Sequence, residues 1–150
     1  MCSSDLVAVS GNFAGGLVGY NRSLGSIGSS YATGAGLGFV DVYDTNGKLI
    51  KQLVARGALN APWGIALAPA DFGTFSGALL VGNVGDGKIN AYDAAAGTSL
   101  GILAATPAPG LLGIAFGNDA NSQPHNTLFF TAGINGGANG IYGRIDLTTP

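Results

Sequence analysis

Apolar residues along this chain occur in short runs, and turn-forming residues separate the runs. Four such runs follow one another at 63–68, 78–84, 88–92 and 100–104. Each run has the length of a β-strand, and the Gly, Asp and Thr residues between runs favour tight turns. The run at 79–81 is apolar on both faces, which predicts a strand between neighbouring sheets, whereas alternation at 89–93 predicts a strand nearer the solvent. The pattern therefore predicts an all-β protein.

The pattern also repeats with a period of 49 residues. Four short antiparallel strands in a repeat of about 40 to 50 residues are typical of one β-propeller blade. We therefore predict that residues 37–150 form a partial β-propeller of about two four-stranded blades: the last two strands of one blade, one full blade and most of another. An antiparallel sandwich is the alternative architecture. The recurring strings are 39–44 with 88–93 (and loosely 141–146), 63–68 with 112–117, and 79–82 with 128–131.

The first 36 residues follow a different rule. We interpret residues 1–6 as an assembly artefact and residues 7–36 as a short Gly/Ser-rich β segment. Residues 11–34, with Gly-Gly-Leu-Val-Gly-Tyr-Asn at 15–21 and Ser-Tyr-Ala-Thr-Gly at 30–34, resemble the GLUG repeat of large bacterial surface proteins. A single copy cannot bury its own apolar face, so it either lacks independent order or adds a strand to the neighbouring sheet. A plain Gly/Ser linker is the alternative.

A second resemblance covers residues 37–150. The strings at 36–44, 59–69, 75–77 and 80–83 resemble the C-terminal part of an uncharacterised exported bacterial propeller family, which often carries a PEP-CTERM-type tail. The string Pro-Trp-Gly-Ile-Ala is also similar to the NHL repeat. The resemblance implies an extracytoplasmic propeller, located outside the cell, at its surface or in the periplasm. It brings no catalytic residues with it.

Composition narrows the possible functions. Charged residues are 9% of the chain, against about 25% in average globular proteins, and 27 of the 150 residues are glycine. Six basic residues provide no patch for nucleic acid. The single Cys2 excludes a disulfide within this chain. The stretch 94–118 is uncharged, but Pro107 and Pro109 argue against a membrane-spanning helix.

Catalytic signatures are weak. Ser99 lies in a Gly-x-Ser-x-Gly string, and Asp119 and His125 follow in the order of a hydrolase triad, but the string lacks the helix that a nucleophile elbow needs. His125 is the only histidine and is expected to be a solvated loop residue. The loop 118–121 lacks the spaced carboxylates of a calcium site. We therefore predict no catalytic residues, no metal site and no cofactor.

The candidate ligand-binding residues are Asn60, Trp63, Asn83 and Asp86. They flank the predicted innermost strand of the full blade, or the turn after its second strand. Trp63 could stack on a planar or sugar ligand; packing of Trp63 between blades and capping of turns by Asn60 and Asn83 are the alternative roles. The predicted function is a non-catalytic binding or scaffold module whose partners are the remaining blades and an unknown small-molecule, glycan or protein ligand. The alternative is part of a lactonase- or quinoprotein-like propeller enzyme whose catalytic residues lie in other blades.

Overall fold

The chain folds into three small antiparallel β-sheets. The computed structural model describes residues 6–11, 33–44, 46, 48–107 and 109–147, and no α-helix occurs among them. Two 3₁₀ turns, η2 (Gly73–Phe75) and η3 (Asn135–Gly137), lie in connections. The all-β prediction is confirmed. The strands are β1 (Leu6–Gly11), β2 (Phe39–Asp44) and β3 (Leu49–Ala55) in the first sheet; β4 (Pro62–Leu67), β5 (Leu79–Asn83), β6 (Lys88–Tyr92) and β7 (Ser99–Ala105) in the second; and β8 (Leu111–Phe116), β9 (Leu128–Ile134) and β10 (Asn139–Ile145) in the third.

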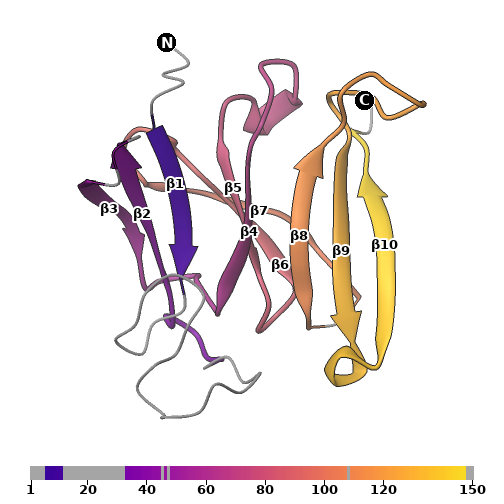
Figure 1. Cartoon of the computed structure of the whole chain (residues 1–150), viewed down its shortest axis with the longest axis horizontal. Coiled ribbons are helices and arrows are strands. Elements are labelled where there is room, and N and C mark those ends of the chain that lie inside the picture. The colour runs from indigo at the N-terminus through magenta and orange to yellow at the C-terminus, as the bar shows by residue number, and fades with distance from the viewer. Residues whose placement is uncertain (1–5, 12–32, 45, 47, 108, 148–150) are drawn as a thin grey trace.

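The three sheets stand side by side in chain order (Figure 1). Within each sheet, strands that are neighbours in sequence are also neighbours in space. The first strand of the second sheet, β4, lies against both β1 and β8. The backbones of β4 and β8 approach closely at Gly64, where an added Cβ would lie 2.4 Å from the carbonyl oxygen of Leu112. The alternative architecture, an antiparallel sandwich, has two sheet layers, whereas this chain has three adjacent sheets.

The 49-residue sequence period is also a period of strand pairing. The β4–β5 and β8–β9 pairs have the same register, and each contains one irregularity at the same place. The β2–β3 and β6–β7 pairs likewise share two irregularities at matching places. A bulge changes the twist of a strand locally, so irregularities at equivalent positions give the paired strands a similar local twist. In β4 the irregularity follows Pro62, and in β8 it follows the equivalent Leu111. In β2 the two irregularities follow Val40 and Val42, and in β6 they follow the equivalent Ile89 and Ala91.

The string at 141–146, which repeats 88–93 only loosely, pairs in the equivalent register as well. Leu79 pairs with Tyr92 in the second sheet, and Leu128 pairs with Ile145 in the third. Leu128 follows Leu79 by 49 positions, but Ile145 follows Tyr92 by 53, because the β9–β10 hairpin is longer and includes η3. A longer hairpin adds residues at its tip and leaves the pairing below it unchanged. This explains why the string is shifted relative to the others.

Apolar side chains fill the two boundaries between sheets. Val40 and Val54 of the first sheet pack with Val81 of the second, and Leu80 of the second packs with Leu128 of the third. β5 is buried along its whole length, which confirms the prediction for a strand between sheets. The expectation that β6 lies near solvent is wrong, because its residues after Lys88 are all buried. Alternate side chains of β6 face one boundary or the other, so the polar and apolar alternation does not mark a solvent face.

The segment before residue 37 contributes one strand. β1 pairs with β2, and Ala8 lies opposite Val42. In the second sheet β5 pairs with β6 in the same way, so β1 is the equivalent of β5. β1 lies ahead of the GLUG-like strings, so the expectation that those strings add a strand to the neighbouring sheet stays a prediction. Residues 1–5 and the GLUG-like strings up to residue 32 lie outside the described residues.

Candidate functional site

Three of the four predicted ligand-binding residues meet at one end of the second sheet. The chain enters β4 beside the turn that follows β5, and two backbone hydrogen bonds join the two segments: Val84 N–H to Ala61 O at 2.9 Å and Gly85 N–H to Asn60 O at 3.0 Å. The side chain of Asn60 continues the connection, because its Oδ1 accepts the backbone N–H of Gly34 at 2.8 Å. Asn60 therefore holds the segment that leads into β2 as well as the turn after β5.

Asn83 ends β5 at this same place and is fully buried. Its Nδ2 donates to the carbonyl oxygen of Ala58 at 2.8 Å, and Asn90 Nδ2 lies 3.4 Å from the same oxygen. The Oδ1 atoms of both asparagines are buried with no hydrogen-bond partner among the described residues. Buried amide oxygens almost always have a donor, so this pair marks a place where a water or ligand donor would be stabilised.

Asp86 closes the turn between β5 and β6. Its carboxylate accepts the backbone N–H of Lys88 at 3.2 Å and pairs with Lys88 Nζ at 3.4 Å. Burial raises the pKa of Tyr92, and the negative charge of Asp86 raises it further. The Tyr92 hydroxyl is buried without a hydrogen-bond partner among the described residues. Asp86 is thus the negative group of this end of the sheet.

Trp63 is the second residue of β4 and is 42% exposed. Its neighbour Pro62 is buried and pairs with Asn83, so the backbone of Trp63 lies beside the end of β5. A half-exposed indole offers an apolar face for stacking. We call Asn60, Trp63, Asn83 and Asp86 the β4-entry set. Its ligand-binding role stays a prediction. Sequence reasoning missed Asn90, because its strand was expected nearer the solvent, where a polar residue is ordinary; the structure buries it.

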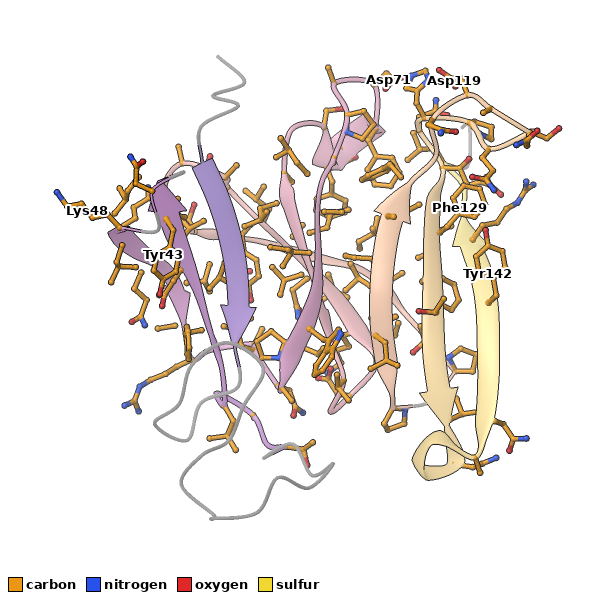
Figure 2. The ribbon with its side chains drawn as sticks, viewed as in Figure 1. Tyr43, Lys48, Asp71, Asp119, Phe129 and Tyr142 are labelled. Atoms are coloured by element: carbon orange, nitrogen blue, oxygen red, sulfur yellow. The ribbon has the colours of Figure 1, made fainter. Side chains whose placement is uncertain are left out.

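A second polar cluster lies at the opposite end of the second and third sheets. His125, on the β8–β9 connection, places Nδ1 2.9 and 3.0 Å from the two carboxylate oxygens of Asp119 and Nε2 2.9 Å from Asp71 Oδ2. Asp71 comes from the β4–β5 connection (Figure 2). The histidine is exposed on a loop, as expected, but it also joins the connections of two sheets. No pattern in the sequence pointed to Asp71 as its partner.

Electrostatics follow this geometry. Hydrogen bonds that the His125 ring donates to Asp119 and then to Asp71 raise the pKa of His125, while the bonds that the His125 ring and backbone N–H donate lower the pKa of Asp119. Both ring nitrogens are occupied by carboxylates, so the arrangement does not offer a base to Ser99, which begins β7. Within the described ranges, no cluster of three or more His, Cys, Asp or Glu side chains is suited to hold a metal ion.

Comparison with known proteins identifies relatives in Acanthamoeba polyphaga mimivirus. The chain is 34% identical over 113 residues to a protein named Uncharacterized protein R648, covering 75% of this chain and 28% of the relative. It is 34% identical over 118 residues to Uncharacterized protein L690, covering 73% of this chain and 29% of the relative. The chain thus spans less than a third of the length of these curated relatives. No family model matches the chain, and no solved structure matches it.

These findings correct the family prediction. Assignment to an exported bacterial family with NHL-like repeats and a PEP-CTERM-type tail is wrong, because the curated relatives are viral and no family model matches, the GLUG repeat included. The physical reason is that the matching strings are short apolar strands with Gly and Pro turns, which any stack of small sheets requires. The extracytoplasmic location stays a prediction. In the described part of the chain, no helix is long and apolar enough to cross a membrane.

Proposed function

We propose that the three sheets are consecutive blades of a β-propeller and that the chain is a non-catalytic binding or scaffold section of a longer protein. The observation that carries the proposal is the strand register, which recurs with its irregularities after 49 residues, or after 50 residues from β3 to β7. A propeller repeats one antiparallel sheet of four strands around an axis. The second sheet has all four strands, and the other two sheets have three each in the described ranges.

The packing between sheets supports the same proposal. Leu111 and Leu128 lie on one face of the third sheet and pack against the second sheet. The equivalent face of the second sheet packs against the first sheet. Leu79 of that face lies 49 positions before Leu128 and belongs to the cluster shared with Val40. The second sheet therefore uses one face toward the first sheet and the other face toward the third, as a blade between two neighbours does.

Within this architecture, we assign ligand contact to the β4-entry set. Trp63 presents an exposed indole, Asp86 adds a carboxylate, and Asn83 has a buried amide oxygen without a partner among the described residues. Aromatic stacking combined with a few directed polar groups is a common way to bind sugars and small planar ligands. A polar or glycan ligand is the class that these groups fit best.

Fluorescence provides a direct test, because Trp63 is the only tryptophan. Titration of the chain with a panel of neutral and amino sugars should shift the Trp63 emission for at least one member. The Trp63→Ala variant should lose binding of that sugar in calorimetry, whereas Tyr142→Ala, which removes an exposed aromatic residue of the third sheet, should bind it normally. Equal binding by both variants would remove the β4-entry set from the proposal.

Two further measurements test the architecture and the absence of catalysis. An experimental structure of the mimivirus relative R648 should show the matched region as adjacent blades of a closed ring, and separate or sandwiched sheets would overturn the proposal. The same purified relative should contain no stoichiometric metal and no quinone absorption. Either signal would instead favour the lactonase- or quinoprotein-like enzyme.

A further inference from the structure

We propose that His125, Asp71 and Asp119 form a pH-sensitive latch between the second and third sheets, closed when the imidazole is protonated and open at the Asp71 side when it is neutral. The latch lies at the end opposite the β4-entry set and does not depend on what that set binds. It is carried by three side chains from two connections, with each ring nitrogen of His125 at hydrogen-bond distance from a carboxylate.

The geometry requires the protonated ring. A neutral imidazole has one N–H donor and one acceptor nitrogen, whereas the imidazolium has two donors. A carboxylate can only accept, so simultaneous bonds from Nδ1 to Asp119 and from Nε2 to Asp71 need both protons. In the closed latch, one positive charge therefore lies between two negative charges.

The two sides of the latch differ in strength. Asp119 lies on the same connection as His125, faces Nδ1 with both oxygens, and also accepts the backbone N–H of His125 at 2.9 Å. Asp71 faces the ring through Oδ2, which is also approached by Asn126 Nδ2 at 3.3 Å. When the ring becomes neutral, it keeps the Nδ1 proton that is hydrogen-bonded to Asp119 and loses the proton on Nε2. The Nε2 lone pair then faces the Asp71 carboxylate. The side that opens is therefore the one between the sheets.

Opening has consequences for the core directly beside it. Phe72 follows Asp71, is fully buried, and meets Phe116 of β8 edge to face with ring centroids 4.9 Å apart. The other charged groups next to the β8–β9 connection are Arg144 and Asp146 at the end of β10, which pair with each other at 2.9 Å. Asp146 also accepts the hydroxyl of Thr127 at 2.8 Å, so this pair holds the connection to its own sheet. The latch, in contrast, reaches the second sheet through Asp71.

The titration of His125 can be followed alone, because the chain has one histidine and therefore one imidazole Cε1–H resonance. In the folded chain its midpoint should lie above the ordinary value of about 6.5. Asp71→Asn and Asp119→Asn should each lower the midpoint. Asp86→Asn, at the opposite end, is the matched control and should leave it unchanged. A wild-type midpoint at or below about 6.5, or one that Asp71→Asn does not change, would overturn the latch.

Hydrogen exchange separates a latch from a passive ion pair. After correction for intrinsic rates, the amides of residues 70–78 should exchange several-fold faster above the His125 midpoint than below it. Asp71→Asn and His125→Gln should remove this pH dependence, while the amides of β5 keep their protection in all variants. If His125 titrates with a raised midpoint but exchange at residues 70–78 stays constant, the contact is only an ion pair and the latch is wrong.

Discussion

Phe72 and Phe116 meet across the boundary between the second and third sheets, with ring centroids 4.9 Å apart and ring planes at 83°. Phe72 comes from the β4–β5 connection and has no exposed surface, and Phe116 ends β8. The edge-to-face arrangement places the positive edge of one ring on the negative face of the other. A residue outside any strand therefore closes this end of the core between two sheets.

Replacement of Phe72 by Ala should destabilise the chain strongly. Removing a buried phenyl ring leaves a cavity and costs about 3–5 kcal/mol of the free energy of unfolding. Tyr142→Ala is the comparison, because Tyr142 stacks on Phe129 at 5.9 Å (Figure 2) but is 65% exposed; its loss should be about 1 kcal/mol. Urea unfolding measures both. Similar losses in the two variants would contradict the assigned position of Phe72 in the core.

Two equivalent glycines should respond differently to the same substitution. An added Cβ at Gly64 would lie 2.4 Å from Leu112 O and 2.9 Å from Ile114 N, so β4 and β8 would have to separate. Gly113 lies 49 positions later, and a Cβ there would meet only Thr131 Oγ1, at 3.1 Å. Gly64→Ala should lower the free energy of unfolding by about 1–3 kcal/mol, and Gly113→Ala should change it little. Thermal unfolding of the two variants checks this, and equal effects would argue against the close approach of the sheets.

Substitutions of Asn83 should test its buried amide. Asn83→Ala removes the 2.8 Å hydrogen bond to Ala58 O and should cost about 1–3 kcal/mol, because it leaves a part-buried carbonyl poorly satisfied. Asn83→Asp places a buried carboxyl group at the same point, and burial raises the pKa of a carboxyl group. The Asp variant should therefore be less stable at pH 8 than at pH 5, relative to wild type. Denaturant melts at the two pH values give the comparison, and a pH-independent difference would mean that position 83 is hydrated.

Asp93 should contribute to acid sensitivity through the β6–β7 turn. The backbone N–H groups of Ala96 and then Ala95 hydrogen-bond its carboxylate and lower its pKa. A lowered folded-state pKa gives stability that is present above the unfolded value of about 3.9 and is lost as the pH falls through the folded value. Asp93→Asn keeps an acceptor for the turn, so its melting temperature should fall less than that of wild type between pH 6 and pH 2. Asp93→Ala should be less stable than wild type already at pH 6, and an unchanged acid profile in the Asn variant would show that the turn does not depend on the charge.

The sequence predicted the strands well because the repeat supplied independent copies of each one. The runs at 63–68 and 78–84 correspond to β4 and β5 within one residue at each end, and 88–92 is β6. Short strands with turn residues between them carry this information locally. The partner of each strand also followed from chain order, because consecutive strands usually pair.

The candidate sites were less predictable for a physical reason. Asn60 and Asn83 were chosen from their positions in the repeat, but their partners lie elsewhere: Gly34 precedes β2 within the first sheet, and Ala58 belongs to the connection from the first sheet to the second. The contact between His125 and Asp71 joins residues 54 positions apart. A hydrogen bond between two connections depends on how the sheets pack, and periodicity does not encode that packing.

The amino-acid order alone thus determined the all-β class, the strand boundaries and the 49-residue repeat, because alternation, turn residues and recurrence are local properties of the chain. Tertiary structure decided which face of each strand is buried, the burial of β6 and the meeting of Asp71 with His125. These features arise where neighbouring sheets press together, and the free energy of that contact depends on side chains that are distant in sequence.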